Sequence, residues 1–281
     1  MRRRVTVARN LAKLWLLLAV PTAAMAFLGW VLGGYRLTLL FGASIVLLAA
    51  ALYWYADRIG MGMIGARELL PGEAPALHSA VERLSARAGV ARPRLYLLPD
   101  GYPRAALAGR GAQGGAALAV STGLLGVASP AELEGIVAHE LAHLRHRDVL
   151  VQTVAAIVAA AVVEAARIGG ALERALLFVL GPLAASFVHL LLSPKREFDA
   201  DRFAAEICDS PHGLADGLLR LESAMELVSF AATPATEPLY STNPFADEGL
   251  AAMLVTHPPL GERVHRLRDL DPEWREKLRA A

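Results

Sequence analysis

Two long apolar runs near the N-terminus carry no charged residue, and they constrain the fold more than any other feature. They cover Leu14–Gly34 and Leu37–Ala56. About 20 apolar residues in an α-helix, at about 1.5 Å each, are enough to cross the hydrocarbon core of a bilayer. The sequence Gly-Gly-Tyr-Arg at 33–36 predicts a tight turn between the runs. We therefore expect residues 1–56 to form a membrane anchor with two spans.

Two other structures are compatible with these runs. One is a pair of helices buried in a soluble core. The other is a secretory signal, in which the Leu16–Val20 core precedes the small-residue site Ala24–Ala26. The apolar run continues past Ala26 instead of stopping, which favours the anchor.

The charges at the N-terminus predict an orientation. Residues 1–56 hold six of the 28 basic residues and none of the 27 acidic ones. Five basic residues precede the first run and one lies in the turn, so the N-terminus and the chain after Ala56 should face the cytoplasm of a cell membrane. Cleavage after Ala26 would leave this orientation unchanged. Basic residues form no stripe interleaved with aromatic ones, which argues against a nucleic-acid partner.

Two further apolar stretches, Val149–Val163 and Ala175–Pro194, predict a helical hairpin over 149–194. The second stretch is long enough to cross a membrane, whereas the first is too short on its own. A hairpin would bring Lys195 back beside Asp148, so the chain segments 57–148 and 195–281 would meet.

The segment before this hairpin carries the strongest chemical signal. Ser129 and Glu132 have the spacing of a capping box, which predicts the start of a helix. On that helix His139 and His143 are four residues apart, so they share one face and can bind one Zn²⁺. Glu140 is placed to take a proton from the metal-bound water. The motif predicts a catalytic zinc site.

A catalytic zinc needs a third protein ligand, and the sequence offers several candidates. His146 would crowd the side of the ion where water binds. Glu164 and Glu173 lie at the far end of the predicted hairpin. We therefore expect Glu197 to be the third ligand, and Asp201, one helical turn later, to hydrogen-bond a ligand imidazole.

Four segments together resemble the HtpX-type membrane zinc metallopeptidases, relatives of the CAAX prenyl endopeptidases. The resemblance covers roughly residues 10 to 270. It implies a mainly α-helical integral membrane protein with a zincin-like catalytic domain and a small β-sheet. It also implies one Zn²⁺, endopeptidase activity on membrane or misfolded proteins, and a cytoplasmic catalytic domain. The matching segments are 120–125, 129–143 followed by Asp148, 196–201 and 256–263.

The same resemblance implies two further site residues. His257 would stabilise the oxyanion of the tetrahedral intermediate, and Arg263 would pair with Asp201. From the residues alone, His257 before two prolines could instead begin a rigid loop, and Arg263 could be a surface residue.

The chain departs from the family at residues 103–110, the segment that the resemblance implies to be an edge strand holding the substrate backbone. Arg104 stands where an Asn is common. Its guanidinium could favour acidic substrates, or it could point to solvent. We also expect strands at Arg94–Leu98 and Ala116–Val120, a pair whose edge could accept an extended peptide.

Three functions are compatible with these features. The first is zinc-dependent proteolysis of membrane or misfolded proteins in quality control. The second is cleavage of one dedicated, possibly lipidated, peptide. The third is a zinc-binding membrane scaffold without turnover. No feature of the sequence indicates an oligomeric state.

Overall fold

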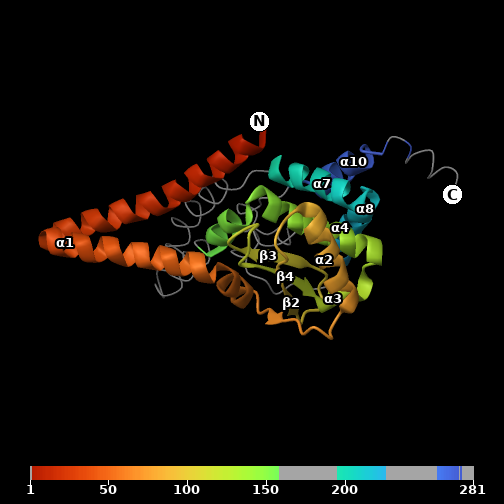
Figure 1. The fold of residues 1–281 in the computed structure, drawn as a ribbon, viewed down its shortest axis with the longest axis horizontal. Coiled ribbons are helices and arrows are strands. Elements are labelled where there is room, and N and C mark those ends of the chain that lie inside the picture. Colours follow the sequence, from red (N-terminus) through yellow and green to blue (C-terminus); the bar gives the residue numbers. More distant parts are fainter. Residues whose placement is uncertain (1, 158–194, 226–257, 272, 274–281) are drawn as a thin grey trace.

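The computed structural model describes residues 2–157, 195–225, 258–271 and 273. Figure 1 shows a long helical arm attached to a globular part that is built from a small sheet and several helices. Most of the predicted hairpin at 149–194, from residue 158 onward, lies outside the described residues, as does His257.

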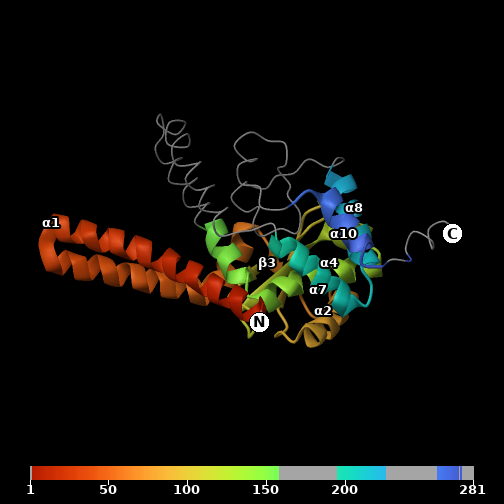
Figure 2. The same cartoon turned by 90° about the horizontal axis from the view of Figure 1, so that it is seen from above.

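The arm is a helical hairpin. Helix α1 covers Arg2–Met63, and its helical geometry is interrupted at two glycines. Gly34 has φ 63° and ψ −154°, a combination that is open essentially only to glycine. A Cβ atom at Gly29 would lie 2.5 Å from the carbonyl oxygen of Leu37, so the two halves of α1 approach closely beside the turn. Figures 1 and 2 both show the two halves of α1 lying side by side, which confirms the predicted turn.

Within the described chain, the segment Ala26–Met63 is long and apolar enough to cross a membrane, and it contains the turn. Its most apolar window of 18 residues has a mean hydropathy of 2.1, and none of that window is buried against the rest of the protein. Large apolar side chains such as Trp30, Leu47 and Trp54 are more than half exposed. Two separate spans in this arm remain a prediction.

The sheet has four strands in the order β1-β2-β4-β3. The central strands β2 (Arg94–Leu98) and β4 (Ala116–Ser121) run parallel, and they confirm the two predicted strands. The prediction that this pair offers an edge is wrong. Strand β1 (Arg67–Glu68) covers one side and β3 (Ala105–Gly109) the other, both antiparallel to their neighbours. The glycine-rich turn from β3 into β4 lets the chain reverse at once, so β3 becomes the edge strand.

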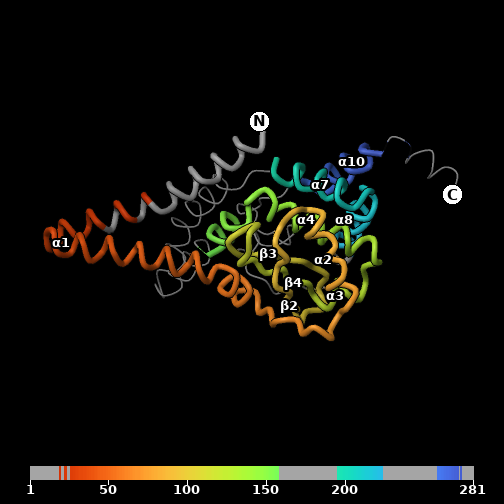
Figure 3. Tube along the Cα trace, viewed as in Figure 1, coloured from red at the N-terminus to blue at the C-terminus, as the bar shows by residue number. Residues whose placement is uncertain are grey.

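Each face of the sheet packs against helices (Figure 3). Leucines 95, 97, 107 and 118 point to the side of α2 (Pro75–Ala88) and α4 (Pro130–His146). The opposite face, largely alanine, packs against Met61 of α1 and Ala156 of the helix at 149–157. A Cβ atom at Gly60 would lie 2.5 Å from the Cβ of Ala108, so the end of α1 rests directly on this face.

Helix α4 is the centre of the globular part. Ser129 and Glu132 form the predicted capping box at its start. It follows the short helix α3 (Thr122–Val127) and packs against α7 (Lys195–Cys208) and α8 (His212–Met225). Helix α10 (Leu260–Arg268) lies on α7 and α8.

The crossing of α4 and α8 depends on a glycine. A Cβ atom at Gly135 would lie 2.4 Å from the backbone nitrogen of Leu214, and backbone cannot move aside cheaply. We therefore predict that Gly135→Ala destabilises the protein by about 1–3 kcal/mol, as overpacking does. The matched control is Gly126→Ala in α3, where a Cβ would meet nothing within 4 Å. Thermal unfolding of the two variants in detergent compares them, and equal midpoints would contradict the prediction.

Candidate metal centre

Three buried side chains from two helices converge in the globular part. His139 and His143 come from α4, and Glu197 comes from the first turn of α7. Each offers one possible ligand atom, and these atoms lie within 4.8 Å of one another. The predicted grouping of the histidines with Glu197 is therefore present in the structure.

The spacing of these atoms fits a tetrahedral metal ion. Bonds of about 2.0–2.1 Å at tetrahedral angles separate neighbouring ligand atoms by about 3.3 Å. The two histidine Nε2 atoms are 3.3 Å apart. In Glu197, Oε2 lies 3.5 Å from Nε2 of His139, and the other carboxylate oxygen, Oε1, lies 3.7 Å from Nε2 of His143. Two imidazoles and one carboxylate are also a common donor set for a catalytic zinc.

His139 is held in orientation by a second carboxylate. Its Nδ1 lies 2.9 Å from Oδ1 of Asp201, which stands one helical turn after Glu197. Arg263 from α10 donates two hydrogen bonds to Asp201, at 2.9 and 2.7 Å. All of these side chains are buried. The structure thus brings together Asp201 and Arg263, as the resemblance implied.

Burial and neighbouring charges shift the pKa values of Asp201, His139 and Arg263. Burial alone would raise the pKa of Asp201, but Arg263 and His139 lower it to about 2. Burial and Arg263 would lower the pKa of His139, but hydrogen bonds to Asp201 and Glu197 raise it to about 9 in the metal-free protein. Burial likewise opposes the charge on Arg263, yet the surrounding carboxylates, including Glu140, raise its pKa. Glu140 itself is buried, on the turn of α4 that carries His139.

The two ends of the predicted apolar hairpin are neighbours. Nε of Arg196 lies 3.8 Å from Oδ2 of Asp148, so the segments before and after 149–194 meet as expected. The same Asp148 oxygen lies 3.6 Å from Nδ1 of His143. Asp148 and Arg196 both lie in segments that match the family, but no role for either followed from the sequence.

Comparison with known proteins gives the family. Residues 71–271 match the family model described as Peptidase family M48. The chain belongs to this family. It is 37% identical over 276 residues to a protein named Protease HtpX homolog from Pelotomaculum thermopropionicum, covering 92% of this chain and 98% of that protein. A Protease HtpX homolog from Pyrococcus abyssi is 36% identical over 277 residues, covering 90% and 93%.

These relatives confirm the HtpX-type resemblance. Because the chain belongs to peptidase family M48, it is a protease. A crystal structure of Ste24p from S. mikatae is also similar, with a TM-score of 0.49 and 16% identity. The similarity covers 95% of this chain and 66% of that one.

Two other candidate residues of this M48 protease have clear positions. His146 lies outside the cluster and contacts the ring of Phe203, so it is not among the grouped ligands. Arg104 is buried, and its guanidinium lies 2.5 Å from the Asp100 carboxylate. The alternative that Arg104 points to solvent is therefore wrong. Its backbone also binds Ser121, which places it at the start of the edge strand.

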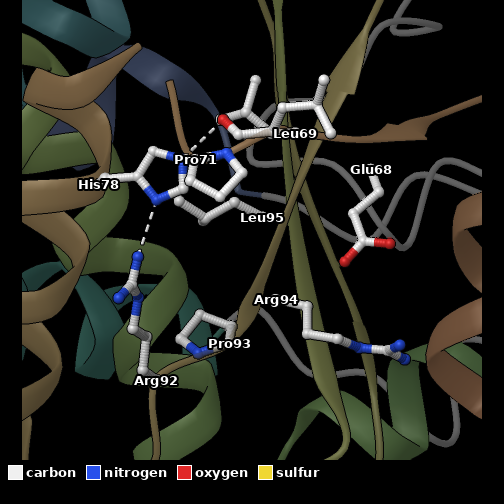
Figure 4. Close-up of a pocket in the computed structure, with 9 residues that line it drawn as sticks. Glu68, Leu69, Pro71, His78, Arg92, Pro93, Arg94 and Leu95 are labelled. Atoms are coloured by element: carbon white, nitrogen blue, oxygen red, sulfur yellow. Dashed lines mark hydrogen bonds between the residues drawn. The ribbon is translucent and has the colours of Figure 1, made fainter. Parts of the chain in front are cut away.

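A shallow surface pocket of about 350 Å³ lies elsewhere, beside β1 and β2. Figure 4 shows His78 and Arg92 in contact on one side of it and Arg94 near Glu68 on the other. None of the cluster residues lines this pocket, so it is a different feature from the candidate metal centre.

The buried Arg263–Asp201 pair allows a test of the cluster in the metal-free protein. We predict that Arg263→Gln destabilises it by about 3–5 kcal/mol, because it leaves a buried carboxylate without its cation. The control is Arg202→Gln on α7, whose partner Asp199 is 3.5 Å away and half exposed like itself. A surface pair of this kind contributes about 1 kcal/mol or less. Denaturant unfolding measures both variants, and similar losses would show that the buried pair has no special role.

Proposed function

We propose that this chain is a zinc-dependent endopeptidase anchored in a membrane, which cleaves membrane or misfolded proteins in quality control. The observation that carries the proposal is the buried group of His139, His143 and Glu197 at tetrahedral spacing, with Glu140 on the same helix. Cleavage of one dedicated, possibly lipidated, peptide is the alternative within the same chemistry.

In this proposal the two histidines and Glu197 hold one Zn²⁺. When bound, the ion lowers the pKa of a coordinated water towards about 7 and polarises the substrate carbonyl. Glu140 accepts the proton released by the attacking water and then donates it to the leaving amine. His257 would donate a hydrogen bond to the oxyanion.

Asp201 and Arg263 have a supporting role in this mechanism. Nδ1 of His139 lies 2.9 Å from Oδ1 of Asp201, so a proton on Nδ1 faces this carboxylate. Nε2 is then available for the metal. The two hydrogen bonds from Arg263 fix that carboxylate, so the imidazole ring cannot rotate away. Neither residue needs to contact the substrate.

The edge strand β3 is our candidate for holding an extended peptide, as the family resemblance implies for residues 103–110. Backbone bonds join Ser121 to Arg104 and Arg110 to Gly115, so alternate residues between them bond to β4. Binding by strand addition uses main-chain hydrogen bonds and therefore tolerates many sequences.

Arg104, which stands where an Asn is common in the family, remains our candidate for a residue that changes how the substrate is positioned. It lies where β3 begins, but its charge is already balanced by Asp100 at 2.5 Å. The pair therefore weakens the expected preference for acidic substrates.

A zinc-binding scaffold without turnover is less well supported. A structural zinc usually has four protein ligands, whereas the described residues group three. A buried glutamate directly after the first histidine would also serve no purpose in such a site.

The role of Glu140 can be tested directly. We predict that Glu140→Gln retains zinc but loses proteolysis by about 100-fold or more, because the general base is gone while all three ligands remain. The control is Glu134→Gln on the same helix, where the carboxylate is half exposed and pairs with Arg83. Metal analysis and digestion of casein by purified protein in detergent, with and without a chelator, measure both effects. Unchanged turnover in Glu140→Gln would refute the role.

The proposed topology has its own test, in a Cys208→Ser background. We predict that Gly72→Cys, in an exposed turn of the globular part, is not labelled by a membrane-impermeant reagent in intact cells. Tyr35→Cys at the exposed tip of the hairpin should be labelled, which serves as the control. The reason is the excess of basic residues before the first span. Labelling at residue 72 but not at residue 35 would reverse the orientation.

A further inference from the structure

We propose that Asp148 is a positioning residue of the metal centre, which orients His143, and that Arg196 holds Asp148 in place. This inference rests on the proposed zinc site. It gives the second histidine the same kind of support that Asp201 and Arg263 give to His139.

The end of helix α4 delivers Asp148 to His143. Arg147 takes the left-handed conformation, with φ 62°. Its N–H donates to the carbonyl of Leu144, and the N–H of Asp148 donates to the carbonyl of His143. This pair of bonds is a Schellman motif, which turns the chain back over the last helical turn. Asp148 is thereby held beside the turn that carries His143.

The His143 ring presents its two nitrogens to different partners. Nε2 faces the cluster, 3.3 Å from Nε2 of His139. Nδ1 lies on the other side of the ring, is buried, and is 3.6 Å from the Asp148 carboxylate. An imidazole that binds a metal through Nε2 carries its proton on Nδ1. The carboxylate is the group that this proton faces.

Arg196 completes the arrangement. It is only 6% exposed, and Asp148 is 1% exposed. The guanidinium lies 3.8 Å from Asp148 and 3.9 Å from Glu197. A buried carboxylate is tolerated only where a cation or hydrogen-bond donors compensate it. Arg196 thus stabilises the charge on Asp148 and links it to the helix that supplies the third ligand.

The Nδ1 atom of each histidine then faces an aspartate carboxylate, and an arginine guanidinium lies next to each of these carboxylates. The arginines come from different parts of the chain. Arg263 is in the C-terminal helix α10, and Arg196 precedes the ligand Glu197 directly in α7. The arrangement around His139 is tighter, with an Asp–His distance of 2.9 Å against 3.6 Å around His143.

The test measures zinc affinity of the purified full chain in detergent, by competition with a chromogenic chelator. Asp148→Asn should bind Zn²⁺ about 10-fold more weakly or worse, as the loss of such partners does in other metal sites. The control is Asp199→Asn on α7, half exposed and paired with Arg202, which should bind as the wild type does. Arg196→Gln should weaken zinc binding in the same direction while all three ligands and Asp148 remain, and it replaces Asp148→Asn if that variant does not fold.

Unfolding of the metal-free variants separates positioning from general stability. A loss of metal-free stability with wild-type zinc affinity would assign Asp148 a structural role only and overturn the proposal. Equal zinc affinity in wild type, Asp148→Asn and Arg196→Gln would overturn it too, and would leave the proposed protease function intact. A wild-type protein that neither binds zinc nor needs it for proteolysis would instead refute the proposed function itself.

Discussion

The two hydrogen bonds between Arg263 and Asp201 join two helices at the candidate metal centre, and the contact of Asp201 with His139 adds a third. Arg263 belongs to α10, Asp201 to α7, and the His139 imidazole behind them to α4. Because all three side chains are buried, the pair cannot separate without leaving a charge in the protein interior. The C-terminal helix is therefore coupled to the geometry of a histidine that lies 124 residues earlier in the chain.

The sheet fixes the position of the N-terminal helical arm relative to β3, the candidate substrate strand. The end of α1 rests on the alanine-rich face, where Gly60 and Ala108 touch almost backbone to backbone. Ala108 belongs to β3, the edge strand. A peptide added to that strand would be held at a fixed distance from the point where the arm leaves the globular part. Small side chains on both elements make this close contact possible.

The sequence predicted the features whose signals are local. The capping box of Ser129 and the histidine spacing lie within one helix, and the predicted hairpin placed Glu197 beside them. Strand β3 was expected only from the resemblance at residues 103–110, because alanine and glycine have low strand propensity. Asp148 was part of the resemblance, but no role for it followed from the sequence. A left-handed residue at a helix end is usually glycine, and here Arg147 takes that position, so the turn that delivers Asp148 is not visible in the sequence.

The buried side chains around the candidate centre carry more negative than positive formal charge. Among the described residues, four buried carboxylates surround it, from Glu140, Asp148, Glu197 and Asp201. The two buried guanidiniums, from Arg196 and Arg263, leave a net charge of −2. In the metal-free protein, hydrogen bonds to Asp201 and Glu197 raise the pKa of His139 to about 9, so a proton on this imidazole offsets part of the charge. A Zn²⁺ bound by the ligands would balance it fully and displace that proton, so binding should become tighter as pH rises towards 9.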